Sequence, residues 1–237
     1  MKTTDLSERL KQVASFIPKG ARLADIGSDH AKLPCYAIEQ GLAVTAVAGE
    51  VAAGPLAAAE KNIRARGHNG TIRAKLGDGL AVLENENVDT ITIAGMGGPL
   101  IARILDEGKS LLSGVTKLIL QPNVAADHIR VWLYENGWSL AAETIMEEDG
   151  HVYEILTAEP GDPDAAYAGR NRDMAMWLGP YLLDEKNNEA FKKKWTKEKE
   201  QLTNIKAQLA RGEKTPALLE KQKKLDRQLG WLEEALA

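Results

Sequence analysis

The amino-acid sequence predicts an α/β fold with a seven-stranded, mostly parallel sheet, followed by a C-terminal antiparallel coiled-coil hairpin of two helices. Three observations support this prediction. Short runs rich in β-branched residues alternate with helical patterns over residues 22–136. Two further strand patterns then follow each other with only a turn between them. The C-terminal residues 186–237 repeat apolar side chains at heptad-like intervals.

The first five strands are separated mostly by helical patterns, and prolines stand near three of the helix starts. Such alternation is typical of a parallel sheet whose crossover helices cover both faces. The strands are expected over residues 22–27, 44–50, 71–76, 88–94 and 117–120, and the helices over 34–40, 55–66, 99–107 and 125–136.

Two more strands are expected at residues 138–145 and 152–157, with Asp149 and Gly150 at the turn between them. An Asp-Gly turn between two strands favours an antiparallel β-hairpin. We therefore expect the sheet domain to span residues 1–160, including an N-terminal helix. Residues 161–185, rich in Gly and Pro, are expected to form a connection with a short helix.

The C-terminal residues 186–237 carry two apolar stripes at a/d-type spacings. Between the stripes, Gly212 is suited to ending one helix and Pro216 to the first turn of the next. Each stripe is narrow, so the two helices are expected to pack against each other as a hairpin.

The charge of the chain is unevenly distributed. The 237 residues have a formal net charge of −4, which at first argues against a nucleic-acid partner. Residues 1–185, however, hold 17 Lys and Arg against 26 Asp and Glu, whereas residues 186–237 hold 13 against 8. A basic C-terminal extension on an acidic domain favours binding of a polyanion, although a solvated lysine-rich helix would give the same counts.

Other features limit the class of protein. No stretch approaches the roughly 20 apolar residues of a membrane span, and the charged N-terminal residues argue against an export signal. A single cysteine, Cys35, fits the reducing cytoplasm. The histidines lack metal-ligand spacing, so no metal site is expected. We expect a cytoplasmic protein that does not bind membranes and is a monomer.

The ligand is expected beyond the carboxyl ends of the parallel strands. The first strand lacks the G-x-G-x-x-G turn that cradles a pyrophosphate, and Asp29 brings a negative charge there. A neutral or cationic ligand is therefore favoured, and S-adenosylmethionine fits because it has a sulfonium, an ammonium and no phosphate. Glu50 is placed for the ribose hydroxyls, Asp78 for the adenine amino group and Asp25 for the ammonium. Each acid alone could simply cap a helix.

Several motifs resemble the bacterial tRNA (adenine(22)-N1)-methyltransferase family, and the resemblance covers nearly the whole chain. It implies the Rossmann-like class I methyltransferase fold. Lys32 departs from the pattern, in which an aromatic residue is expected, and this bears on substrate contact. The motifs are Leu23-Ala-Asp-Ile-Gly-Ser-Asp-His-Ala-Lys-Leu-Pro34, Ala48-Gly-Glu-Val-Ala-Ala-Gly-Pro55, Gly77-Asp-Gly79, Ile93-Ala-Gly-Met-Gly-Gly98 and Leu120-Gln-Pro-Asn123, with the leader Leu6–Leu10 and the C-terminal hairpin.

The resemblance implies methyl transfer from S-adenosylmethionine to N1 of adenine 22 in tRNA. That nitrogen has a free lone pair at neutral pH, so the protein would chiefly orient the base and exclude water. Asn123 is expected to orient the nucleophile, and Asp29 to accept the N6 proton after transfer. Expected cofactor contacts are Asp25, Gly27, Ser28, His30, Glu50, Asp78, Gly79, Gly95, Met96 and Gly97; expected substrate contacts are Gly98, Gln121, Pro122, Arg9, Lys192, Lys193 and Lys197.

Two alternatives remain open on the sequence. One keeps the cofactor but changes the acceptor to another RNA or to a protein amide, because Gln121-Pro122-Asn123 is similar to an amide-methylating motif. The other is a non-catalytic RNA-binding scaffold that uses the C-terminal hairpin. Saturable binding of S-adenosylmethionine separates the scaffold from the two enzymes, and the methylated product separates the enzymes.

Overall fold

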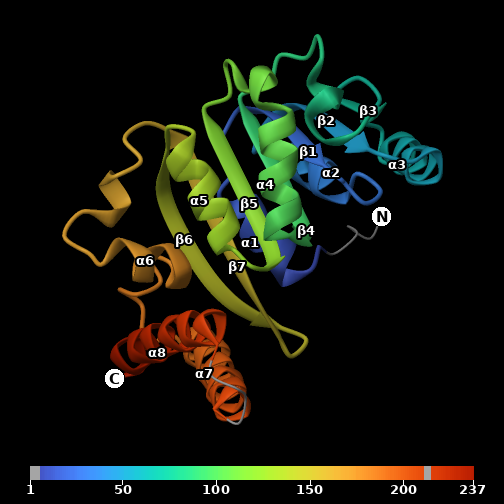
Figure 1. Ribbon diagram of the computed structural model, residues 1–237. Coiled ribbons are helices and arrows are strands. Elements are labelled where there is room, and N and C mark those ends of the chain that lie inside the picture. The colour runs from blue at the N-terminus through green and yellow to red at the C-terminus, as the bar shows by residue number, and fades with distance from the viewer. Residues whose placement is uncertain (1–5, 211–214) are drawn as a thin grey trace.

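A computed structural model describes residues 6–210 and 215–237 of the chain (Figure 1). Within these residues a seven-stranded sheet has the order β3-β2-β1-β4-β5-β7-β6. The β1, β2, β3, β4 and β5 strands are parallel, and β7 is antiparallel to both β5 and β6. The predicted sheet with its final hairpin is therefore confirmed. The predicted helix stop at Gly212 lies outside the described residues.

The strands lie at the predicted positions, but the last four extend past their predicted carboxyl ends. The strands are β1 (Ala21–Ile26), β2 (Ala43–Glu50), β3 (Ile72–Leu76), β4 (Thr90–Gly97), β5 (Lys117–Val124), β6 (Trp138–Glu148) and β7 (His151–Pro160). The β4 and β5 strands run on through the glycine motif and the Gln-Pro-Asn motif, which we had expected to follow the strands. Their pairing is irregular at Met96, so the two motifs lie side by side as strand extensions.

The helices lie close to their expected positions. The helices are α1 (Glu8–Ser15), α2 (Lys32–Glu39), α3 (Ala53–Ala65), α4 (Gly98–Glu107), α5 (Asp127–Glu135), α6 (Arg172–Leu178), α7 (Glu189–Leu209) and α8 (Pro216–Leu236), with short 3-10 turns at Gly79–Leu83, Lys109–Leu112 and Ala165–Tyr167. Pro216 stands in the first turn of α8, as predicted.

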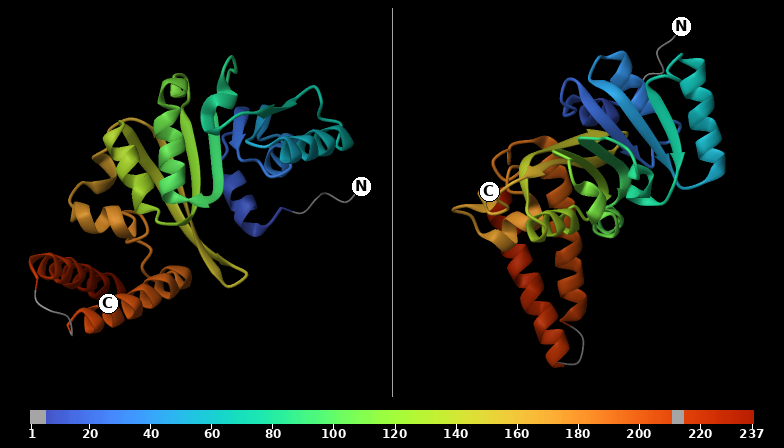
Figure 2. Two further views of the ribbon diagram at one scale, coloured as in Figure 1. Left: turned by 45° about the vertical axis from the view of Figure 1, so that its right-hand side comes forward. Right: turned by 90° about the horizontal axis from the view of Figure 1, so that it is seen from above.

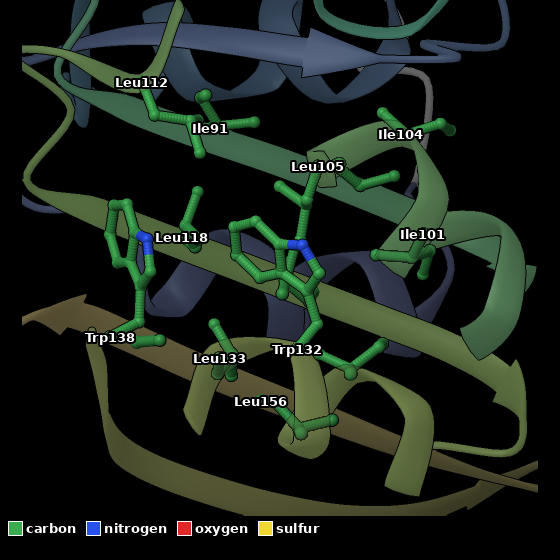
Figure 3. Close-up of a cluster of buried hydrophobic side chains, with 14 of the residues drawn as sticks. Ile91, Ile101, Ile104, Leu105, Leu112, Leu118, Trp132, Leu133, Trp138 and Leu156 are labelled. Atoms are coloured by element: carbon green, nitrogen blue, oxygen red, sulfur yellow. The ribbon is translucent and has the colours of Figure 1, made fainter. Parts of the chain in front are cut away.

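Two apolar layers cover the sheet, one on each face. Alternate residues of β5 serve them: Leu118 and Leu120 face the α4 and α5 side, whereas Ile119 belongs to the cluster with α1, α2 and α3. Figure 3 shows the first layer, in which Trp132 of α5 lies between Leu105 and Leu133. Burial of both faces explains why these strands read as nearly continuous apolar runs.

The C-terminal hairpin is joined to the sheet domain by its own apolar cluster. Phe191 and Trp195 at the start of α7 are buried with Ile145 of β6 and with Met174 and Leu178 of α6. The rest of the hairpin projects away from the sheet, as Figure 2 shows. The α7 and α8 helices pack on each other as predicted, but the base of the hairpin is part of a shared core rather than a separate unit.

A buried ion network lies beside this junction. Arg130 of α5 is fully buried and bonds Glu143 of β6 at 2.6 Å and Glu154 of β7 at 2.5 Å. Lys194 of α7 pairs with the other oxygen of Glu154. The network therefore links α5, the β6–β7 hairpin and α7. None of the described helices has the length and apolarity that a membrane span requires.

Candidate active site

Two acidic residues stand at the carboxyl ends of adjacent strands. Asp25 of β1 and Glu50 of β2 are both buried, at 4% and 5% relative exposure. Burial raises the pKa of Asp25 to about 6, while hydrogen bonds from Ser28 and Thr92 oppose the rise. Burial also raises the pKa of Glu50. Two desolvated carboxylates side by side are costly on their own, and a cationic ligand would relieve that cost.

Asp25 is held from two sides. The Ser28 hydroxyl donates to Oδ2 and the Thr92 hydroxyl of β4 donates to Oδ1, both at 2.6 Å. Ser28 is itself buried, and its hydroxyl is bound to Asp25; its predicted contact with the cofactor stays a prediction. Thr92 did not stand out in the sequence, because a threonine within a strand gives no signal of its own.

The loop after β1 has an unusual backbone. Gly27 has φ of 70°, and Asp29, His30 and Ala31 follow with φ of 44°, 69° and 55°. Consecutive left-handed residues are strained for side chains, and such strain gathers at functional sites. The loop places the His30 N–H 3.4 Å from Glu50 Oε1. A Cβ atom on Gly27 would lie 2.4 Å from Met96 Cε, so this glycine admits the methionine side chain.

Asp29 is exposed and already has a cationic partner. Lys32 Nζ donates to it at 2.9 Å, and His30 Nε2 lies 3.5 Å away. The Lys32 hydrogen bond lowers the pKa of Asp29. A carboxylate with a lowered pKa is a weak base, so this geometry favours a charged Asp29 over one that takes up a proton.

Asp78 lies next to the acid pair along the sheet edge. It precedes the 3-10 turn that begins at Gly79, and its side chain is exposed. Two exposed apolar side chains stand at the ends of neighbouring strands. Val51 follows β2 with 71% relative exposure, and Leu76 ends β3 with 56%. An exposed acid together with exposed apolar side chains at neighbouring strand ends suits a planar base with an amino group. Neither Val51 nor Leu76 had been predicted as a site residue.

A hydrogen-bond network joins the ends of β4 and β5. The Gln121 side chain, which is fully buried, accepts from Gly95 N at 3.0 Å. Its Nε2 donates to the Pro122 carbonyl at 2.9 Å and to Asn123 Oδ1 at 3.3 Å. Asn123 Nδ2 donates to the Gly95 carbonyl at 2.8 Å. Asn123 itself is exposed, so its amide is accessible to a substrate.

Arg9 of α1 belongs to the same hydrogen-bond network. Its guanidinium donates to Gln121 Oε1 and lies 5.1 Å from the ring centroid of Tyr153. Its backbone N–H donates to Glu148 at 3.2 Å. We had expected Arg9 to contact the substrate, and the structure places its guanidinium against Gln121. Tyr153 was missed because nothing in the sequence ties β7 to α1.

The remaining predicted residues differ in their surroundings. Gly98 is buried, and a Cβ atom there would lie 1.9 Å from the Ala125 carbonyl, so close packing of two chain segments requires this glycine. Its substrate contact stays a prediction. Gly97 is partly exposed at the end of β4. Lys193 pairs with Glu147 at 2.6 Å and Lys192 lies 3.6 Å from Glu189.

The site fits an organic cation better than a metal or a phosphate. In the described parts of the chain, no group of three or more His, Cys, Asp or Glu side chains is arranged to hold a metal ion. The acid pair of Asp25 and Glu50 disfavours a phosphate. A cofactor with a sulfonium, an ammonium and a ribose has groups complementary to both acids. The hydrogen-bond network of Gln121 and Asn123 lies at the neighbouring ends of β4 and β5.

Comparison with known proteins agrees with this geometry. Residues 23–234 match the family model described as TrmK, tRNA (adenine(22)-N(1))-methyltransferase. The chain is 47% identical over 236 residues to the tRNA (adenine(22)-N(1))-methyltransferase of Bacillus subtilis strain 168, with 100% of this chain and 99% of that protein covered.

Solved structures agree over the same length. A B. subtilis m1A22 tRNA methyltransferase superposes with a TM-score of 0.94 at 46% identity, covering 98% of this chain and 99% of that one. A Streptococcus pneumoniae protein in complex with S-adenosyl-L-methionine gives 0.85 at 41% identity, covering 98% and 100%. TrmK of M. capricolum with S-adenosyl-homocysteine gives 0.81 at 25% identity, covering 98% and 97%.

Proposed function

The chain belongs to the tRNA (adenine(22)-N(1))-methyltransferase family, and from this we infer that it transfers a methyl group from S-adenosylmethionine to N1 of adenine 22 in tRNA. Family membership over the full chain favours this function over a protein-amide acceptor and over a non-catalytic scaffold. The individual roles below are our assignments.

The strand ends of β1, β2 and β3 bind the cofactor. Glu50 accepts hydrogen bonds from the ribose hydroxyls, Asp25 faces the ammonium, and Asp78 faces the adenine amino group. The buried position of Asp25 and Glu50 supports these roles, because a cation compensates two desolvated carboxylates. Gly27 and Gly79 leave room at the turns, and Met96 packs beside the methyl donor.

Bound S-adenosylmethionine supplies the electrophilic methyl group. The residues of the chain orient the adenine so that its N1 lone pair faces that group, and they exclude water. Asn123 offers a donor and an acceptor to the Watson–Crick edge of the base. Gln121 and Pro122 fix Asn123, and Gly95, Gly97 and Gly98 allow a flat base to approach the backbone. A base in a stacked tRNA strand must be extruded to reach this place.

The product of N1 methylation is a cation, which a nearby carboxylate stabilises. We assign this electrostatic role to Asp29, because the Lys32 contact lowers its pKa and keeps it charged. Uptake of the N6 proton by Asp29, our first expectation, is less well supported by that contact. His30 assists by holding the loop against Glu50 through its backbone N–H.

The basic C-terminal hairpin holds the tRNA backbone. Lys192, Lys193 and Lys197 lie on α7, the hairpin helix that packs on the sheet domain. Contacts to phosphates read the tRNA by shape and make binding strongly salt-dependent. We also propose that the protein acts in the cytoplasm, where tRNA is found, and as a monomer.

One observation supports the assignment of the site above all. The buried acids and the hydrogen-bond network of Gln121 and Asn123 lie at the same edge of the sheet. The test uses two tRNA transcripts, one with adenine and one with 1-deazaadenine at position 22. Methyl transfer from labelled S-adenosylmethionine is expected for the first alone, because the second has a carbon at the reacting position. Equal labelling of both would contradict attack by N1.

A further inference from the structure

A cleft of about 350 Å³ lies between the end of β5 and the first turns of α7. Its walls are residues 122–126, the β6–β7 turn at residues 150–152, Glu154, and one side of α7 that includes Lys193, Lys194 and Lys197. This volume is within the range of about 300–1,000 Å³ that small-molecule sites occupy. We call it the β5–α7 cleft.

The β5–α7 cleft begins at the proposed active site. Asn123, whose amide binds the Gly95 carbonyl at 2.8 Å, also lines the cleft. A ligand bound in the cleft would therefore lie next to the target base that we assign to Asn123. In an RNA strand the group next to a base is the neighbouring nucleotide.

The charges of the cleft suit a phosphate. Three lysines line it, of which Lys194 pairs with the buried Glu154 and the exposed Lys193 pairs with Glu147. Lys197 is exposed, and no ion pair of its ammonium is found within the residues that the structure describes. Glu198 is the acid that opposes these lysines from the same helix.

The wall formed by the end of β5 contains an exposed apolar side chain. Val124 is 65% exposed although its neighbours Pro122 and Ala126 are buried, so a large apolar side chain faces open space beside Asn123. Contact of this side chain with a sugar or a base would remove apolar surface from water.

A neighbouring recess of about 240 Å³ shares Ala125, Ala126, Lys194 and Glu198 with the β5–α7 cleft. Trp195 lines this recess, and its Nε1 is a buried donor without a partner within the described residues. A buried donor without a partner is uncommon. It supplies an unused hydrogen bond next to the cleft.

We propose that the β5–α7 cleft binds the nucleotide adjoining the target adenine in the tRNA strand, with Lys193 and Lys197 holding its phosphate and Val124 packing against its sugar or base. This inference rests on the proposed function. It explains why α7 packs against the sheet domain through Phe191 and Trp195, since that packing fixes the lysines relative to Asn123.

The test is a double-mutant cycle between the enzyme and its substrate. The full-length protein and its Lys197→Ala variant each methylate three tRNA transcripts: an unmodified one and two with a neutral methylphosphonate linkage on the 5′ or the 3′ side of adenine 22. Lys221→Ala on α8, a basic position away from the cleft, is the matched control.

We expect Lys197→Ala and one of the two methylphosphonates each to lower kcat/KM for tRNA about tenfold, as for a charge-assisted hydrogen bond. Their combined loss should be clearly smaller than the product of the two single losses, and what the linkage still costs in the variant comes from Lys193. The loss from Lys221→Ala should instead multiply with that of the same linkage. Additive losses for Lys197→Ala at both linkages would overturn the proposal. Absence of product from wild type and unmodified tRNA would instead reject the proposed function, and unchanged S-adenosylmethionine affinity confirms that the variant is folded.

Discussion

The side-chain amide of Asn123 donates a 2.8 Å hydrogen bond to the backbone carbonyl of Gly95. This bond joins the end of β5 to the end of β4, where the pairing of the two strands is irregular. The exposed amide of Asn123 is therefore fixed in position before any substrate binds. Fixed polar groups contribute to catalysis because they need little reorganisation during the reaction.

Replacement of Asn123 by Ala should lower the single-turnover rate of methyl transfer by about ten- to a hundredfold, the loss expected for one or two hydrogen bonds. The affinity for S-adenosylmethionine should stay within about twofold, because Asp25 and Glu50 are untouched. Rapid-quench assays and calorimetry measure the two quantities. Asn204→Ala, at an exposed position of α7, is the control and should change neither.

We expect the buried carboxyl of Asp25 to lower the stability of the cofactor-free protein while it strengthens cofactor binding. Its pKa is raised to about 6 from 3.8, so the folded protein holds its proton more tightly than the unfolded chain. The resulting destabilisation is absent below the unfolded pKa, grows as the pH rises through about 6, and is complete above it. Asp25→Asn should remove it, stabilising the cofactor-free protein by up to about 3 kcal/mol at pH 8 but little at pH 4.

The same Asp25→Asn variant should bind S-adenosylmethionine far more weakly at pH 8, because the ammonium loses its counter-charge. Urea unfolding at both pH values and calorimetry at pH 8 check the two statements. A variant that is destabilised equally at both pH values would contradict the proposed cause.

Arg9 is expected to act as a positioning residue. Its guanidinium bonds Gln121, which in turn holds Gly95 and Asn123. Arg9→Met should lower kcat while KM for tRNA changes little, whereas a phosphate contact would mainly raise KM and reduce the salt dependence of binding. Arg103→Met, on the exposed side of α4, provides the control. A KM effect alone would return Arg9 to the phosphate role.

The Arg130 network should be important for stability. Burial and Glu154 raise the pKa of Glu143, whereas Lys194 and Arg130 lower that of Glu154. Arg130→Met leaves the buried Glu143 without its cationic partner and Glu154 with Lys194 alone, and should cost about 3–5 kcal/mol at pH 8. The loss should shrink near pH 5, where protonation removes the unpaired charge of Glu143. Denaturant unfolding at the two pH values tests this, and a pH-independent loss would point to lost packing instead.

Much of the fold could be predicted from local patterns. The β-branched runs, the prolines near helix starts and the Asp149-Gly150 turn each reflect chemistry within a few residues. The acids at the ends of β1 and β2 could be predicted too, because parallel strands bring their carboxyl ends to one edge.

Contacts between distant segments could not be predicted. Arg9 meets Gln121 across 112 positions, and Arg130 meets Glu154 across 24, and no local pattern encodes either pair. The docking of the hairpin on α6 and β6 was missed for the same reason. Phe191 and Trp195 fit an a/d stripe, yet they also fill a core shared with Met174 and Leu178.

One measurement tests the account most directly. An unmodified tRNA transcript with adenine at position 22, and the same transcript with guanine there, are incubated with the full-length protein and S-adenosylmethionine. The products are then mapped by nucleoside and fragment mass spectrometry. We predict one 1-methyladenosine at position 22 of the first transcript and none in the second. A methyl group at another position, or its appearance in both transcripts, would contradict the account.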